Sequence, residues 1–151
     1  MSAPRARRVL YTMGSAKKSA SEFFEQLRSH RVTLVADVRP RNHVRLNGFT
    51  QADNLAYLLP QFGIQYEHWG DFVPVQDLCG GHKPRTDWEE CVAGCRLLLR
   101  LTWAVRRMPK GTFDHKTVCL LGTKPSARHC HRRLAAEIIR PLHIGLEVQH
   151  L

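Results

Sequence analysis

The stretch VTLVADV, residues Val32 to Val38, decides the fold that this sequence predicts. Its apolar residues fall on both faces of an extended chain, so neither face suits contact with water. Such a strand is typical of the middle of a parallel sheet that is covered on both sides by helices. Asp37 and Arg39 stand at its carboxyl end, which places two opposite charges at one edge of the predicted sheet.

Similar short apolar runs predict four more strands, over residues 9–13, 64–69, 118–121 and 145–150. Helical patterns separate the strands. These helices are expected from residue 19, from residue 50, over residues 87–108 and over residues 130–140. Alternation of strands and helices predicts an α/β fold in three layers, with a mainly parallel five-stranded sheet and helices on both faces. A length of 151 residues fits one domain, 1–151.

Two of the expected helices carry start signals. Ser19 and Glu22 have the spacing of a capping box, and Thr50 and Asp53 repeat that spacing. Gly63 stands where the second of these helices would end. The residues expected on its buried side are Leu55, Leu58, Leu59 and Phe62.

The chain is strongly basic, with a formal net charge of +10 and a pI of about 10.0. A pI above about 9 is typical of nucleic-acid-binding domains. The same charge also attracts phosphates and anionic metabolites. Composition alone therefore leaves two partners open, a nucleic acid and a phosphorylated small molecule.

Composition also bounds the compartment. No apolar run approaches the length of about 20 residues that a transmembrane helix needs, and no secretory leader follows the basic N-terminus. We expect a cytoplasmic protein with no membrane partner. Its five cysteines have no regular spacing, which favours reduced thiols over a disulfide scaffold.

Polar residues follow the predicted strands, and in open α/β sheets ligands bind beyond the carboxyl ends of the strands. Tyr66 and His68 alternate on the third strand, so they share a face. The ligand-binding residues predicted on these grounds are Gly14, Ser15, Asp37, Arg39, Tyr66, Gly80, Gly81, Thr123 and Arg132. Arg39 suits bidentate contact with a phosphate or carboxylate. The alternative is that Asp37 and Arg39 form an internal pair that ties two loops together.

The segment Cys130-His131-Arg132 opens the last predicted helix. Free N–H groups at a helix start attract anions, and Arg132 adds a positive charge. A thiol in that environment is open to activation, which makes Cys130 a candidate nucleophile and His131 a candidate acid or base. The alternative is a small buried cysteine beside solvated basic residues. Whether the protein is an enzyme therefore stays open.

Metal ligation is not expected. Cys91 and Cys95 lie four residues apart on the apolar side of their predicted helix, which favours packing in the core. The sequence holds neither a CxxC pair nor an HExxH motif. We predict no metal and no cofactor.

The order and spacing of several short motifs resemble the family known as domain of unknown function 488, over nearly the whole chain. The motifs are Thr12-Met13-Gly14-Ser15, Asp37-Val38-Arg39, Tyr66-Glu67-His68, Leu78-Cys79-Gly80-Gly81 and Cys130-His131-Arg132. The resemblance implies an α/β fold and a site at the strand ends, and it implies no reaction. Where the family pattern has Cys-Ala-Glu, this sequence has Gly122-Thr123-Lys124. The chain should therefore lack any step that relatives perform with that cysteine or acid.

The main hypothesis is a small α/β protein that binds a phosphate-bearing or nucleic-acid-derived ligand in a basic pocket at the strand ends. A second hypothesis is a non-enzymatic nucleic-acid-binding module that uses Arg96, Arg100 and Arg107 with the loop from Arg39 to Arg45. The third is a degenerate family member that acts as a partner or scaffold protein.

Overall fold

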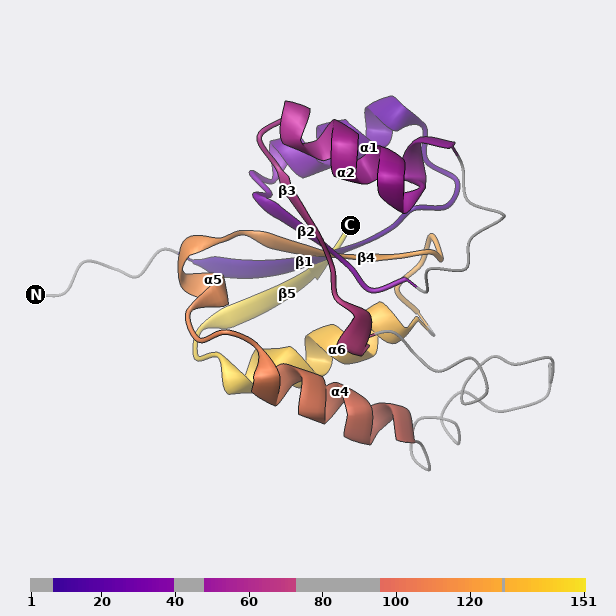
Figure 1. Ribbon diagram of the computed structural model, residues 1–151. Helices are drawn as coiled ribbons and strands as arrows, with labels where there is room; N and C mark the ends of the chain where they lie inside the picture. The colour runs from indigo at the N-terminus through magenta and orange to yellow at the C-terminus, as the bar shows by residue number, and fades with distance from the viewer. Residues whose placement is uncertain (1–6, 40–47, 73–95, 129) are drawn as a thin grey trace, which may run out of the picture.

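The computed structural model describes residues 7–39, 48–72, 96–128 and 130–151, with side chains undescribed at 96–101 and 131. It contains a five-stranded sheet in the order β3-β2-β4-β1-β5, and every neighbouring pair is parallel (Figure 1). The strands are β1 (Arg8–Gly14), β2 (Leu34–Asp37), β3 (Gln65–His68), β4 (Val118–Gly122) and β5 (Leu146–His150). The predicted five-stranded sheet is confirmed, and VTLVADV supplies one of its interior strands.

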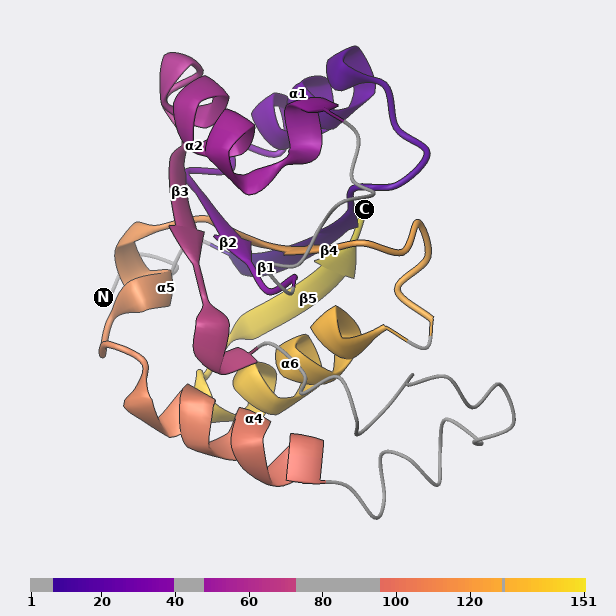
Figure 2. The same cartoon turned by 45° about the vertical axis from the view of Figure 1, so that its right-hand side comes forward.

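Helices cover both faces of this sheet, which confirms the predicted three layers (Figures 1 and 2). One face carries α1 (Ala20–Ser29) and α2 (Ala52–Gln61), and the other carries α4 (Arg96–Arg107) and α6 (His131–Ile139). Shorter elements are α5 (Thr112–His115) and the 3-10 turns η1 (Gly48–Thr50), η2 (Gly70–Phe72) and η3 (Arg140–Leu142). Of the helix predicted over 87–108, the part before residue 96 lies outside the described residues.

Alternation along β4 explains why two separate cores form. Val118 and Leu120 belong to the core under α4 and α6, while Cys119 and Leu121 belong to the core under α1 and α2. All four side chains have 0 % exposure. Burying each leucine contributes roughly 1.5–3 kcal/mol. A strand that is apolar on both faces can satisfy both cores only in the interior of the sheet.

The start of α1 is the predicted capping box. Ser19 Oγ accepts a hydrogen bond from the backbone N–H of Glu22 at 3.2 Å, and the Glu22 carboxylate accepts one from the backbone N–H of Ser19 at 2.9 Å. These bonds satisfy N–H groups that the helix itself leaves unpaired.

Replacing Ser19 with alanine should lower the free energy of unfolding by about 1 kcal/mol, because the cap hydroxyl is lost. Urea unfolding followed by circular dichroism measures the change. Ser29→Ala is the matched control, since Ser29 Oγ contacts the Gln26 carbonyl and His30 Nδ1 at the other end of α1. Equal losses in the two variants would contradict a capping role for Ser19.

The predicted start of α2 is wrong. The residue at its N-cap is Gln51, with no side-chain cap, and Thr50 lies buried in η1. The Thr50 carbonyl accepts a hydrogen bond from Arg39 Nη2 at 2.7 Å, so Thr50 takes part in a tertiary contact and does not open α2. The prediction that Phe62 lies on the buried side of this helix is also wrong, because its side chain is 43 % exposed and stacks on Phe24. Gly63, with φ of +74°, ends the helix as expected.

The helix that follows β4 lies on a different face of the sheet from the helices that follow its two neighbouring strands, β1 and β2. The helices that follow β1 and β2 lie on one face of the sheet, whereas α6, which follows β4, lies on the other (Figure 1). Such a reversal is the topological switch point at which open α/β sheets bind ligands. The fold thus directs attention to the carboxyl ends of β1, β2 and β4.

Within the described residues, no helix combines the length and the apolar character needed to cross a bilayer.

Candidate functional site

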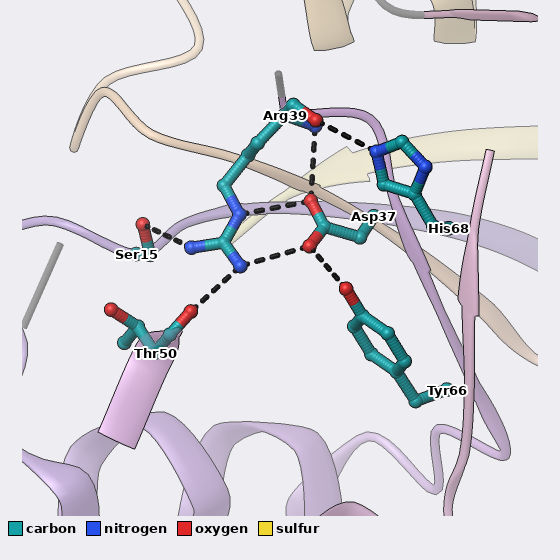
Figure 3. A network of polar contacts seen from close by, with 6 residues as sticks. All are labelled: Ser15, Asp37, Arg39, Thr50, Tyr66 and His68. Carbon is teal, nitrogen blue, oxygen red and sulfur yellow. Dashed lines mark hydrogen bonds and ion pairs between the residues drawn. The ribbon is translucent and has the colours of Figure 1, made fainter. Parts of the chain in front are cut away.

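Asp37 and Arg39 form a buried ion pair at the end of β2. Arg39 Nε donates to Asp37 Oδ1 at 2.9 Å, and Arg39 Nη2 donates to Oδ2 at 2.8 Å (Figure 3). The backbone N–H of Arg39 also donates to Oδ1, at 3.0 Å. The two side chains are only 2 % and 1 % exposed. In this bidentate geometry each charge is neutralised by the other inside the protein.

The pair is tied to three other elements. Arg39 Nη2 donates to the Thr50 carbonyl in η1, and Arg39 Nη1 contacts Ser15 Oγ after β1 at 3.4 Å (Figure 3). The Tyr66 hydroxyl on β3 donates to Asp37 Oδ2 at 2.7 Å. His68 Nε2 lies 3.0 Å from the Arg39 carbonyl. Four predicted ligand-binding residues, Ser15, Asp37, Arg39 and Tyr66, therefore meet in one network, and the internal Asp–Arg pair is present.

The network fixes the charge states of its members. Burial by itself raises the pKa of Asp37, but the hydrogen bonds and charge of Arg39, with the Tyr66 hydroxyl, more than offset it and leave the pKa below its usual value. Burial raises the pKa of Tyr66, and the hydrogen bond to Asp37 raises it further. At neutral pH Asp37 is therefore charged and Tyr66 is protonated, which makes neither a ready acid or base.

Arg132 forms a second buried cluster at the start of α6. Its side chain has 0 % exposure. Nη1 donates to the Lys124 carbonyl at 2.6 Å and to Cys130 Sγ at 3.3 Å, while Nε contacts Thr12 Oγ1 at 3.4 Å. Nη2 lies 3.5 Å from the Pro125 carbonyl. Among the described residues, no carboxylate lies within 4.0 Å of this guanidinium, so its charge is balanced there by dipoles alone.

The two arginine clusters lie on opposite faces of the sheet edge. Asp37 shares its face with Val35, in the core under α1 and α2, while Thr12 shares its face with Leu10, in the other core. Between them, backbone pairing continues past the strand ends, from Ser15 N to the Gly122 carbonyl at 2.9 Å. The sequence predicted one pocket for these residues, and the structure divides them into two clusters.

Gly122 makes room for Arg132. A Cβ at position 122 would lie 2.9 Å from Arg132 Cδ and 3.2 Å from Cys130 Sγ. Arg132 therefore packs against Gly122, the residue that stands where the family pattern has a cysteine. A cysteine side chain at this position would require Arg132 to shift.

Two basic side chains, Lys18 and His150, lie near Arg132. Burial lowers the pKa of Lys18, and the charge of Arg132 lowers it further. Burial also lowers the pKa of His150, again followed by Arg132 and then Arg133. His150 Nδ1 lies 2.6 Å from Thr12 Oγ1, the same hydroxyl that Arg132 contacts. The positive charges of Lys18 and Arg132 make this part of the edge favourable to an anion.

The start of α6 also favours an anion. Its N-cap residue, Cys130, makes no side-chain capping bond, and its first turn has no acidic residue. The corresponding positions of α1 hold Ser19 and Glu22. The positive end of the α6 dipole is thus not offset by a local carboxylate.

The thiols are poorly placed for chemistry with a dissolved substrate. Cys130 is 3 % exposed, and Cys119 is fully buried. Burial raises the pKa of Cys119 to about 12. His131, the other predicted catalytic residue, begins α6, and its side chain lies outside the described residues. Nucleophilic Cys130 and acid–base His131 stay predictions.

Some predicted site residues are not brought to either cluster by the described part of the chain. Gly80 and Gly81 lie outside it, as do Cys91 and Cys95. Thr123 is half-buried, and its carbonyl accepts a hydrogen bond from Ala16 N at 3.0 Å. Where side chains are described, no three His, Cys, Asp or Glu residues are grouped so as to hold a metal ion.

Sequence reasoning missed four participants, namely Thr12, Lys18, Thr50 and His150. Thr12 carried a usable signal, because it is the polar residue of an otherwise apolar strand and alternates with Leu10. His150 ends β5, which pairs with β1 in a register that sets it beside Thr12. That register was not visible in the sequence.

Comparison with known families identifies the family of this chain. The family described as "Domain of unknown function DUF488" matches residues 19–139. The chain belongs to this family. The DUF488 match includes the Asp37–Arg39 pair and Cys130 to Arg132, but it starts after β1 and ends before β5, so Thr12 and His150 lie outside it. Searches of curated proteins and of solved structures found no match.

Proposed function

We propose that this DUF488 protein binds a phosphate-bearing ligand at the carboxyl edge of the sheet, over the loop that joins β4 to α6. The observation that carries the proposal is the burial of the Arg132 guanidinium without a carboxylate partner among the described residues. Buried charges are normally paired. An anion bound above the loop would supply the missing negative charge.

The basic side chains near the loop have different roles in binding the ligand. Arg132 is fully buried, so it acts through its charge and by holding the carbonyls of Lys124 and Pro125. Lys18 and His150 are more accessible and can contact the ligand directly. The start of α6 adds N–H groups and the positive end of its dipole. The proposal is one of binding, because Asp37 and Tyr66 keep fixed charge states and both described thiols are buried.

The test is a thermal and chemical denaturation series with inorganic phosphate. Phosphate should stabilise the protein by about 2.7 kcal/mol when its concentration is 100 times Kd. Sodium chloride at the same ionic strength should stabilise it far less, since it supplies screening without a bidentate oxygen ligand. Isothermal titration calorimetry gives Kd directly.

Lys18→Met is the informative variant, because it removes an accessible charge near Arg132 and leaves Arg132 in place. We expect phosphate affinity to fall about tenfold, which corresponds to 1.4 kcal/mol. Arg28→Ala is the matched control, since Arg28 is exposed on α1 and pairs only with Glu25 among the described carboxylates. The proposal fails if chloride stabilises as well as phosphate, or if both variants weaken binding equally.

A further inference from the structure

A cavity of about 530 Å³ lies beside β3, and it is lined in part by His68, whose Nε2 contacts the Arg39 carbonyl. Its lining comes from β3, η2, the C-terminal end of α4 and the segment from Pro109 to Lys116 that contains α5. Cavities that bind small molecules usually measure about 300–1,000 Å³. Nothing in the proposed function uses this cavity.

Its floor is apolar and partly aromatic. Trp69 and Phe72 have ring centroids 5.3 Å apart, and both belong to or pack against the core that includes Ala104. Met108 lines the same wall and packs on that core. Such a surface suits a flat apolar ring.

Trp69 is held in one orientation. Its indole N–H donates to Glu67 Oε2 at 2.9 Å, and its backbone N–H donates to the Asp37 carbonyl at 2.8 Å. The side chain is only half-buried. An indole that is fixed by its polar atom and still partly accessible loses little conformational freedom when a ligand stacks on it.

The rim is cationic. Arg107, Lys110 and Lys116 line the cavity, against two carboxylates, Glu67 and Asp71. Both carboxylates are engaged, Glu67 by the Trp69 indole and Asp71 by Arg107 at 4.0 Å. Within the described part of the chain, Lys110 and Lys116 have no carboxylate within 4.0 Å. The two lysines flank α5 and are exposed, so they are available to an anionic group.

We propose that this cavity binds a nucleoside monophosphate, with the base against Trp69 and Met108 and the phosphate between Lys110 and Lys116. A purely apolar ligand would leave both lysines without a partner, and a small inorganic anion would leave the aromatic floor in water. Stacking of the base on the indole and charged hydrogen bonds to the phosphate would both contribute to affinity. The volume lies in the range of cavities that bind small molecules.

The experiment titrates the full chain with adenosine 5′-monophosphate, adenosine and ribose 5-phosphate by calorimetry. The last two carry the base without the phosphate and the phosphate without the base. We expect each to bind at least about tenfold more weakly than the nucleotide. Ribose 5-phosphate binding as tightly as the nucleotide would overturn the proposal, as would failure of the nucleotide to bind at millimolar concentration.

A charge-matched pair of double variants locates the phosphate. Lys110→Ala with Lys116→Ala should weaken nucleotide binding at least about tenfold and leave adenosine binding unchanged. Arg28→Ala with Arg140→Ala removes two exposed charges elsewhere and should change neither. Equal weakening by both pairs would show long-range attraction only and would overturn the site.

Lys18→Met separates this cavity from the proposed phosphate site at the carboxyl edge. It should weaken only the binding of phosphate groups at that edge, and the nucleotide binding that Lys110→Ala with Lys116→Ala weakens should persist in it, because Lys18 does not line the cavity beside β3. If Lys18→Met weakens nucleotide binding and the Lys110/Lys116 variant does not, the nucleotide binds at the carboxyl edge and this proposal is wrong.

Discussion

Asp37→Asn is expected to lower the free energy of unfolding by about 3–5 kcal/mol, the usual effect of breaking a buried ion pair from one side. The substitution keeps the shape of the side chain but leaves the Arg39 guanidinium without its counter-charge at 1 % exposure. It also weakens the acceptor of the Tyr66 hydroxyl. Urea unfolding at pH 7 measures the change against typical total stabilities of about 5–15 kcal/mol.

Two comparisons isolate the charge. Glu137→Gln breaks an exposed pair with Arg133 on α6 and should change stability by less than about 1 kcal/mol. Adding Arg39→Met to Asp37→Asn should recover part of the loss, since no unpaired charge then stays buried. If Asp37→Asn is no worse than Glu137→Gln, the pair at the end of β2 does not support the fold.

The same pair sets a dependence on pH. The folded protein holds the pKa of Asp37 below its unfolded value of about 3.9. A carboxyl with a depressed pKa contributes its stability above the unfolded pKa and loses it as pH falls through the folded pKa. The wild type should therefore lose stability in acid more steeply than Asp37→Asn, in the range below about pH 4. Parallel acid profiles for the two proteins would contradict this assignment.

The layers of the fold were predictable because they follow from local patterns. A strand has apolar residues at successive positions when both of its faces are covered. The run from Val118 to Leu121 has this pattern in the sequence, and β4 is covered on both faces in the structure. Ser19 and Glu22 cap α1 because both groups come from the same turn. Thr50 has the same spacing to Asp53, yet it ends η1, and Gln51 is the residue at the N-cap of α2. The spacing alone could not show that a 3-10 turn precedes this helix.

The structure groups the predicted site residues differently from the single pocket that the sequence predicts. Asp37, Arg39 and Arg132 do lie at the carboxyl edge, as parallel topology requires. Their division between two faces follows from the crossovers, because α6 carries Arg132 on the face opposite to α1 and α2, and the sequence does not mark which face a helix takes. The burial of both arginines was equally invisible, because charged residues are mostly exposed unless the fold provides partners. Here two of the four described partners of Arg132 are the backbone carbonyls of Lys124 and Pro125, which no sequence pattern marks.

Gly14→Ala should be the most disruptive single-methyl substitution in the described chain, with a loss above about 3 kcal/mol, the upper end for overpacking. An added Cβ would lie 1.8 Å from the Lys124 carbonyl oxygen and 2.6 Å from its carbon. These are backbone atoms, and the same carbonyl accepts the 2.6 Å hydrogen bond from Arg132. Relief of the clash must therefore move the β4–α6 loop and release Arg132. Urea unfolding measures the loss, and proton exchange at Ser15 and Ala16 reports the broken backbone pairing.

Substitutions of two other glycines by alanine should cost less stability, because the added methyl group contacts a movable side chain or nothing. At Gly122 it would meet the Arg132 side chain at 2.9 Å, and that side chain can shift, so Gly122→Ala should cost about 1–3 kcal/mol. At Gly48 nothing lies within 4 Å, and alanine there should leave stability unchanged or raise it by up to about 1 kcal/mol. If Gly14→Ala proves as mild as Gly48→Ala, the Lys124 carbonyl of the β4–α6 loop does not lie against Gly14 at the end of β1. The phosphate site that depends on that loop would then lose its geometry as well.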